Sequence, residues 1–342
     1  MNKKATIYDI AKKLNLSAAT ISRALNGNTR ISEKTRLEVV KMANELNYEQ
    51  NNLARALKSG KSYTVGVIVP RIDNNFLSSV IRGIEEELQS FGYHVIICQT
   101  HEMPEKEIEN INTLLNAQID GLLLSTCNVS KENIKLINKI VSKNIPVVFF
   151  DRKMDVQGTS SVTLNDYQGA YNATKHLIIQ GARKIAHFSG DRSLAIYEDR
   201  FKGYHDALKD NNIPFNKDYV IKVKSKIDEG KEAIKHLLSL KDKPDALFSS
   251  SDFAALGAIQ ELKLNQISIP EKFIVFGFGN EPFTQFNELS ISSIDQSPVK
   301  MGKIAATIFL EKIENKLDKT SKNIVLEPEL KLRDSTNNKV NQ

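Results

Sequence analysis

The sequence is poor in the residues that build metal sites and disulfide frameworks. Its 342 residues include only two cysteines, Cys98 and Cys127, and both lie in apolar runs typical of strands. We therefore expect two buried thiols in a reducing cytosol. The six histidines have no spacing typical of metal ligands, so we predict neither a metal nor a cofactor.

Long hydrophobic runs are also missing. No apolar stretch approaches the roughly 18 residues that a membrane span requires. The N-terminus is basic and then amphipathic, without the continuous apolar stretch of a secretory signal. These features predict a cytoplasmic protein that has no contact with a membrane.

The motifs of common nucleotide-dependent enzymes do not occur. The predicted strand at residues 64–69 is not followed by a Gly-x-Gly-x-x-Gly turn, and the chain contains no P-loop and no nucleophile elbow. We therefore predict that the protein is not an enzyme.

Positive charge is distributed unevenly. The chain carries 47 basic and 41 acidic residues, and residues 1–60 hold 11 of the basic and 5 of the acidic ones. The remaining 282 residues hold 36 of each, so the whole excess of +6 lies in the N-terminal segment. A basic segment attracts a phosphate backbone, although a solvated face without a partner remains the alternative.

Residues 7–26 have the pattern of a helix, a tight turn and a second helix. Ile7, Ile10, Ala11 and Leu14 repeat at helical spacing, and Ser17 is placed to cap the second helix. Such a pair presents its second helix to the major groove of DNA. The sequence therefore predicts a sequence-specific DNA-binding unit, completed by a third helix at residues 33–46 with Val39, Val40, Ala43 and Leu46 facing inward.

After a polar segment at residues 49–62, strands and helices alternate. Near-continuous apolar strands alternating with helices predict parallel sheets that are covered on both faces. Two such series, starting near residues 64 and 184, predict two similar lobes with a cleft at the carboxyl ends of the strands. We predict an all-α headpiece at residues 1–48, a linker at 49–62, a two-lobed α/β core at 63–333 and a polar tail at 334–342.

The sequence resembles the lactose-repressor (LacI/GalR) family of transcription regulators over residues 5 to about 333. The resemblance is carried by eight stretches, namely residues 6–11, 17–26, 31–36, 46–48, 54–57, 165–169, 252–258 and 277–280. It implies a helix-turn-helix headpiece, a hinge helix and a core like that of periplasmic sugar-binding proteins. It also implies a homodimer that binds a near-palindromic operator and responds to an effector in the cleft.

The resemblance assigns DNA contacts to the headpiece. Ala18, Ala19 and Arg23 match positions that contact base edges, and Arg can donate two hydrogen bonds to guanine. Alanine makes few specific contacts with base edges, so sequence specificity is expected to depend on Arg23, Ser22 and DNA shape. The positions that match phosphate contacts are Thr6, Tyr8, Ser17, Thr20 and Asn26. Core packing for Tyr8, and helix propensity alone for Ala18 and Ala19, remain alternatives.

The hinge is assigned in the same way. Leu57 matches a leucine that enters the minor groove, and Ala54 lies on the same short segment. A helix this short is unstable alone and is expected to form on the operator. The proline usual for the family is replaced by Gln50, and a plain flexible linker is the alternative.

Effector contacts are expected at the carboxyl ends of the strands, where polar and aromatic side chains suit a sugar. The candidates are Phe76, Asp151, Arg152, Tyr197, Arg200, Ser251, Asp252 and Asn280. The resemblance assigns Arg200, which matches the effector-binding arginine of the family, and Tyr197 lies one turn before it. Core packing for Phe76 and helix capping for Asp252 remain alternatives. The family commonly has aspartate where this chain has Gly279, so Asn280 or Glu281 would have to supply the acceptor, or the ligand differs from the common hexoses.

Three points remain open at this level. The effector is expected to be a sugar or a sugar derivative, with a purine-type co-repressor as the alternative. A sugar-binding protein without a regulatory role would explain the core but not the headpiece. The tail lacks a leucine heptad, so we expect a dimer formed through the core and no tetramer.

Overall fold

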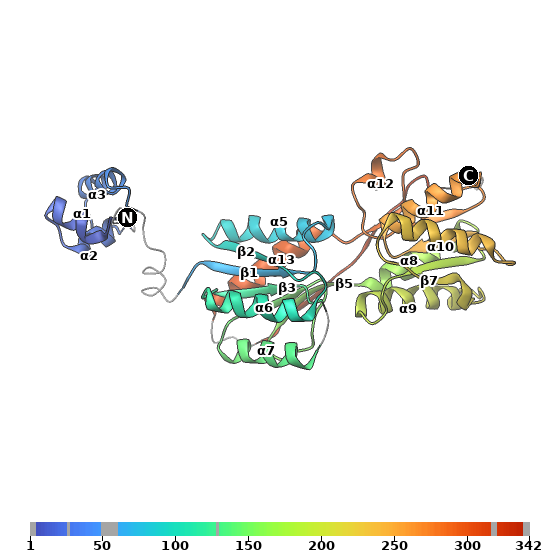
Figure 1. Ribbon diagram of the computed structural model, residues 1–342, viewed down its shortest axis with the longest axis horizontal. Helices are drawn as coiled ribbons and strands as arrows, with labels where there is room; N and C mark the ends of the chain where they lie inside the picture. Colours follow the sequence, from blue (N-terminus) through green and yellow to red (C-terminus); the bar gives the residue numbers. More distant parts are fainter. Residues whose placement is uncertain (1–4, 26–27, 49–60, 128–129, 316–319, 338–342) are drawn as a thin grey trace. The chain divides into compact units, whose positions relative to one another are not determined.

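The computed structural model describes residues 5–25, 28–48, 61–127, 130–315 and 320–337. The chain forms two compact units, residues 1–62 and 63–342 (Figure 1). The predicted contacts of Asn26, Ala54 and Leu57, and the departure at Gln50, lie outside the described residues. In the described part, no helix has both the length and the apolar character needed to cross a membrane.

The first unit contains three helices around a small apolar core. They are α1 (Ile7–Leu14), α2 (Ala18–Leu25) and α3 (Glu33–Glu45). The core consists of the buried side chains of Ile10, Ala11, Ile21, Ala24, Val39 and Ala43. Val40 was expected to face inward but is 42% exposed, because successive residues of a helix point about 100° apart and the buried Val39 faces the core.

Side chains that hydrogen-bond to free backbone amides start each of these helices. Thr6 and Asp9 form a capping box at α1, with the Thr6 backbone amide donating to Asp9 Oδ2 over 2.8 Å. The Ser17 hydroxyl accepts from the Thr20 amide at α2, and Ser32 accepts from the Thr35 amide at α3. The local sequence thereby determines where the helices begin.

The second unit contains two α/β lobes. Lobe 1 is built on a six-stranded parallel sheet with the order β11-β5-β4-β3-β1-β2. Its strands are β1 (Thr64–Val69), β2 (His94–Gln99), β3 (Gly121–Leu124), β4 (Val147–Phe150), β5 (Ser160–Leu164) and β11 (Asn323–Leu326). Its helices are α5 (Asn75–Gln89), α6 (Pro104–Asn116), α7 (Lys131–Ser142) and α13 (Pro298–Glu314). Helices α5 and α13 cover one face of the sheet and α6 and α7 the other (Figure 1).

Lobe 2 is built on a four-stranded parallel sheet with the order β7-β6-β8-β9. Its strands are β6 (Ile185–Ser189), β7 (Val220–Lys222), β8 (Ala246–Ser249) and β9 (Ile274–Phe276). Helices α8 (Asp166–Ile179) and α9 (Ala195–Asp210) pack together, as do α10 (Ile227–Ser239) and α11 (Asp252–Leu264). The remaining elements are η1 (Lys217–Tyr219), α12 (Phe283–Phe286) and the antiparallel pair β10 (Ser293–Asp295) and β12 (Glu329–Lys331).

The chain passes between the lobes three times, after β5, before α13 and after β11. The two covered parallel sheets confirm the predicted fold class. Strand β5 was not predicted, because its first two residues, Ser160 and Ser161, are polar, yet both are buried.

The end of the chain differs from the expected polar tail. Ser335 and Thr336 are buried in lobe 2, where the Ser335 hydroxyl donates to the carbonyl of Val275. These hydroxyls satisfy backbone groups beside β9 and β10, so the folded core continues beyond residue 333.

Candidate functional site

The exposed face of α2 is the candidate DNA interface. Ala19 and Arg23 are exposed, and Ala18, Thr20 and Ser22 are partly buried. Arg23 forms no ion pair with any residue that the structure describes, so its guanidinium is available to a base or a phosphate. Ser17 and Thr20 are joined by a 2.8 Å hydrogen bond between their hydroxyls.

Two further predicted contacts of the headpiece occupy helix α1 and its start. Tyr8 is 72% exposed, which rules out the alternative that its ring packs in the core. The Thr6 hydroxyl donates to Asp9 Oδ2 over 2.6 Å, so its role in this structure is to cap the helix.

The candidate effector site is a cleft between the two lobes of the core. Lobe 1 contributes Asn74, Phe76, Leu77, Asp151 and Arg152. Lobe 2 contributes Ile196, Tyr197, Arg200, Ser225, Ser250, Ser251, Asp252, Phe253, Phe278, Gly279, Glu281 and Gln296. Seven of the eight residues predicted from the sequence therefore lie around one cleft.

Arg200 is the central cation of this cleft and is 5% exposed. Its Nε donates to Asp166 Oδ1 over 2.7 Å, and its Nη1 donates to the carbonyl of Ser250 over 3.1 Å. Its guanidinium carbon lies 3.6 Å from the centroid of the Phe278 ring. A buried arginine needs an anionic partner, and Asp166 of the protein itself supplies one.

Burial sets the ionisation of Asp166. Removal of its carboxyl from water raises its pKa to about 6, although the neighbouring Arg200 guanidinium acts in the opposite direction. The pair is thus held together without a ligand, and Arg200 Nη2, 3.5 Å from Gln296 Oε1, is the donor with the weakest protein partner.

Asp151 and Arg152 form the lobe 1 wall of the cleft. The Ser125 hydroxyl donates to Asp151 Oδ2 over 3.0 Å, and burial raises the pKa of the Asp151 carboxyl. Arg152 Nη1 donates to Glu102 Oε2 over 2.8 Å. Arg152 Nε is buried and donates no hydrogen bond within the described part of the chain.

Asp252 lines the cleft, but both of its carboxylate oxygens accept hydrogen bonds from other residues of the protein. Oδ2 accepts from the backbone amide of Glu281 over 2.9 Å, and Oδ1 accepts from the Ser293 hydroxyl over 2.7 Å. Burial raises the pKa of Asp252 to about 6. The side chain holds the loop after β9 in place. The N-cap of α11 is Ser251, so the alternative that Asp252 caps this helix does not agree with the structure.

The prediction for Asn280 does not agree with the structure. Its side-chain amide donates to Asp295 Oδ2 over 2.9 Å, and its oxygen accepts from Arg333 Nη2 over 2.6 Å. Asn280 is absent from the cleft lining, because these two bonds direct its amide to β10 and the segment after β12. Glu281 lines the cleft in its place.

Glycine at residue 279 has a physical explanation. Its φ of +132° is one that L side chains rarely adopt, and a Cβ there would lie 3.3 Å from Asp252 Oδ2. An aspartate with this backbone would be strained and would face a second carboxylate. The departure from the family pattern is therefore consistent with the local backbone.

Several residues of the cleft were not predicted from the sequence. Ser250, Phe278 and Gln296 directly follow or closely follow β8, β9 and β10. Placing every side chain after a strand's carboxyl end in the cleft would have found them. Ser250 Oγ is informative because it is buried with no hydrogen-bond partner among the described residues.

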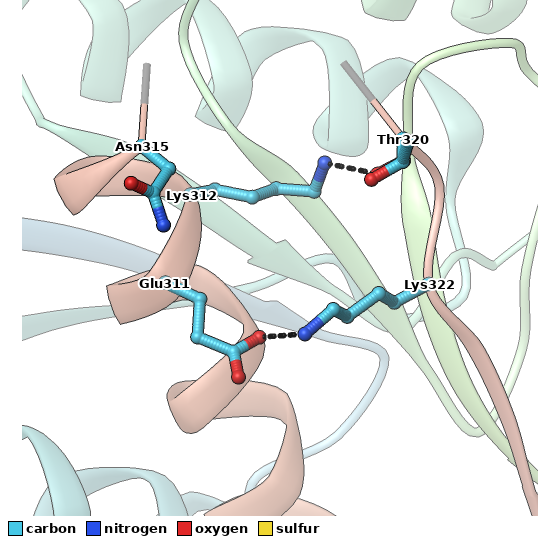
Figure 2. A pocket seen from close by; sticks show the side chains of 5 residues that line it. All are labelled: Glu311, Lys312, Asn315, Thr320 and Lys322. Atoms are coloured by element: carbon cyan, nitrogen blue, oxygen red, sulfur yellow. Dashed lines mark hydrogen bonds and ion pairs between the residues drawn. The ribbon is translucent and has the colours of Figure 1, made fainter. Parts of the chain in front are cut away.

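A second hollow lies on lobe 1 between the end of α13 and the segment before β11 (Figure 2). It is lined by Glu311, Lys312, Asn315, Thr320 and Lys322. Lys312 Nζ donates to the carbonyl of Thr320 over 2.9 Å, and Lys322 pairs with Glu311. Because both lysines are engaged with the protein, this hollow is the weaker candidate. In the described residues, no group of three His, Cys, Asp or Glu side chains could hold a metal ion.

Comparison with known proteins identifies the family of both parts of the chain. The profile "Bacterial regulatory proteins, lacI family" matches residues 6–51, and the profile "Periplasmic binding proteins and sugar binding domain of LacI family" matches residues 62–328. Catabolite control protein A of Priestia megaterium is 32% identical over 332 residues, covering 97% of this chain and 99% of its own. The HTH-type transcriptional repressor PurR of Vibrio vulnificus (strain CMCP6) is 32% identical over 331 residues, covering 97% and 98%.

A solved structure of the lac repressor dimer, bound to operator and an anti-inducer, matches the fold. It aligns with a TM-score of 0.86 at 22% identity and covers 98% of this chain and 99% of its own. The chain belongs to the LacI family of bacterial transcriptional regulators, with a DNA-binding helix-turn-helix unit and a core like that of periplasmic binding proteins.

Proposed function

We propose that the protein is a repressor that binds a near-palindromic operator as a homodimer, and that a sugar or sugar derivative in the cleft sets its operator affinity. The Ser250 hydroxyl supports the choice of this site, because it is buried without a hydrogen-bond partner among the described residues, and such a group favours a hydrogen-bonding ligand. The rings of Phe76, Tyr197 and Phe253 supply apolar faces for the C–H side of a sugar ring.

A purine is the second candidate ligand. The same rings can stack on a purine, and one relative at 32% identity is a repressor named PurR. A sugar needs more hydrogen-bond partners for its hydroxyl groups than a purine does. Measuring the response of operator affinity to both classes of compound distinguishes the two candidates.

Dimerisation is proposed to involve the edge of the lobe 1 sheet. Strand β2 forms that edge, and its Ile96 and Ile97 are 39% and 48% exposed. An exposed, apolar edge strand is a surface that proteins usually cover. Light scattering of Ile97→Lys, with Ile179→Lys on α8 as the control, tests this surface: a loss of dimers in the first variant alone supports it.

The first experiment is a pull-down of sheared genomic DNA of the source organism by the purified protein at physiological salt. A small number of sites with a shared two-fold motif supports the proposal, and Arg23→Ala should reduce their recovery. Diffuse binding that is unchanged when sugars and purines are added would contradict an operator-binding regulator.

The second experiment measures operator affinity with and without sugars and purines. Coupling of about 1–3 kcal/mol would change the affinity by about 5- to 150-fold. Tyr197→Ala should abolish this response, whereas Tyr171→Ala, on α8 and outside the cleft lining, should retain it. An unchanged response in Tyr197→Ala would show that the effector does not bind in this cleft.

A further inference from the structure

The cleft is lined by more acidic than basic side chains. Its carboxylates are those of Asp151, Asp252 and Glu281, and its guanidiniums are those of Arg152 and Arg200. Asp252, Glu281 and Arg200 are buried, at 1%, 7% and 5% exposed, so water screens their charges poorly. The balance of charge in this cleft therefore indicates which kind of ligand it can bind.

Both guanidiniums are already neutralised by the protein. Arg200 pairs with Asp166, and Arg152 Nη1 donates to Glu102 Oε2 over 2.8 Å. Neither Asp166 nor Glu102 lines the cleft. Arg152 Nε also lies 3.8 Å from Asp151 Oδ2, so two acids share this one cation. Because the described cations of the lining are neutralised without a ligand, an anionic ligand would gain little from them.

The two carboxylates of lobe 2 lie beside each other. Asp252 Oδ2 accepts from the backbone amide of Glu281, and a Cβ at Gly279 would lie 3.3 Å from Asp252 Oδ2 and 3.8 Å from Glu281 Cγ. Neither Asp252 nor Glu281 forms an ion pair within the part of the chain that the structure describes. Arg333 attracts Asp252 from beyond ion-pair distance, and its Nη2 donates to Asn280. Asp252 and Glu281 thus form an acidic wall of the cleft.

The ionisation of this acidic wall is consistent with its geometry. Burial raises the pKa of Asp252 to about 6, and burial together with the Asp252 carboxylate raises the pKa of Glu281 to about 7. A buried carboxylate without a cation is costly. A cation bound at the wall would stabilise both charged forms and would be held by both.

A separate observation on the same cleft points to a ligand. Ser250 directly follows β8, lines the cleft and is 5% exposed. Its hydroxyl oxygen is buried and has no hydrogen-bond partner among the described residues. A hydroxyl oxygen can accept a hydrogen bond from an N–H or O–H donor. A ligand that brings such a donor into the cleft would satisfy it.

We propose that the effector is a sugar that carries a protonated amino group, and that Asp252 and Glu281 bind this ammonium at the acidic wall. The inference rests on the proposed function, because it names the chemical class of the effector in the same cleft. An ammonium has three donors and no acceptor, which suits a wall of carboxylate oxygens. Asp151 adds a third carboxylate from lobe 1, so the same cation is attracted from both lobes. Such a ligand favours the closed cleft over an open one.

Isothermal titration calorimetry of the full-length protein at pH 7 tests the amine. The probes are glucosamine, galactosamine and mannosamine, each compared with its parent hexose and its N-acetyl derivative. The N-acetyl group keeps the nitrogen and removes the charge. We expect at least one amino sugar to bind about tenfold or more tightly than both of its uncharged counterparts, because hydrogen bonds to charged groups are the stronger ones. Glucuronate, an acidic sugar, should bind more weakly than that amino sugar.

Two variants and one control locate the amine. Glu281→Gln removes a charge from the acidic wall with little change in volume, and the ratio of amino-sugar to hexose affinity should fall about tenfold or more. Asp151→Asn removes the lobe 1 charge and should lower the same ratio to a smaller extent. It provides the test from lobe 1 if Glu281→Gln does not fold. Glu288→Gln, an exposed acid that pairs with Lys263, should keep the ratio of the parent protein.

Three outcomes would overturn the inference. They are amino sugars that bind no more tightly than their uncharged counterparts, tighter binding of glucuronate, and an unchanged affinity ratio in the folded variants. The proposed function fails separately, if no sugar or purine alters operator affinity. A neutral sugar or purine that alters operator affinity, with no preference for amino sugars, would leave the proposed function standing and refute the amine.

Discussion

The polar side chains of the headpiece and of the core differ in their exposure and in how far along the chain their hydrogen-bond partners lie. On α2, Arg23 and Ala19 are exposed, and the hydroxyls that bond do so with neighbours three residues away. In the cleft, Arg200 and Asp166 are buried, and the bonds of Arg200 reach 34 and 50 residues along the chain. The headpiece surface is therefore assembled by local sequence, whereas the cleft depends on the whole core being folded.

The comparison predicts that substitutions in the cleft affect folding and that substitutions on α2 affect binding. Arg200→Ala leaves Asp166 buried without a cation, and breaking such a pair costs about 3–5 kcal/mol. Urea denaturation at pH 7 should show this loss in the unfolding free energy of the core. Arg82→Ala, which removes an exposed arginine 3.9 Å from Glu86, should cost about 0–1 kcal/mol. Equal losses of unfolding free energy in the two variants would contradict a larger contribution of the cleft to stability.

The pH dependence of stability should come from the core. His187 is buried between the rings of Phe248 and Tyr204, and burial lowers its pKa to about 3. In the unfolded chain its pKa is 6.5, so the unfolded form binds the proton first and stability falls as the pH drops below 6.5. From pH 7 to pH 5, this group should remove about 2 kcal/mol.

Relative to the parent protein, His187→Phe should gain about 2 kcal/mol of unfolding free energy between pH 7 and pH 5, measured from urea midpoints of the core. The exposed His236 on α10 is the matched control, and His236→Gln should show the same pH dependence as the parent protein. A pH dependence in His187→Phe equal to that of the parent protein would contradict this contribution of His187. Asp166, Asp252 and Glu281 act in the opposite direction, since their raised pKa values give stability that is lost as the pH rises toward 6 or 7.

On the headpiece, Arg23→Ala should weaken operator binding without unfolding the protein. Loss of a bidentate contact to guanine costs about 1–3 kcal/mol of discrimination. Fluorescence anisotropy should show a larger loss for the operator than for scrambled DNA. Arg36→Ala on α3, which also removes one positive charge, should weaken both duplexes alike. A similar loss on both duplexes for Arg23→Ala would make it a phosphate contact.

The smallest expected effect concerns the start of α1. Thr6→Ala removes a capping side chain and should destabilise the helix by about 1 kcal/mol. Hydrogen exchange of the amides at the start of α1 should become faster, whereas Thr29→Ala, at an exposed position, should leave it unchanged. No difference between the two variants would mean that the capping box contributes little.

Much of the fold was predictable because its signals are local. Helix caps such as Ser17 and apolar runs such as residues 246–249 place elements directly in the sequence. Strand β5 was not predicted from the sequence, because its first two residues are serines whose burial depends on neighbouring strands. In the cleft, Phe76, Tyr197 and Arg200 were found from position and resemblance, while the orientation of Asn280 was not.

The sequence by itself determined the helix-turn-helix pattern, the concentration of positive charge in the first 60 residues and the alternation that produces two parallel sheets. These properties depend on residues that are neighbours in the chain. Only the tertiary structure decided that Asp166 neutralises Arg200, that Asp252 braces a loop, and that Glu281 rather than Asn280 lines the cleft. Those outcomes depend on which distant groups meet in a buried space, where each polar group must find a partner.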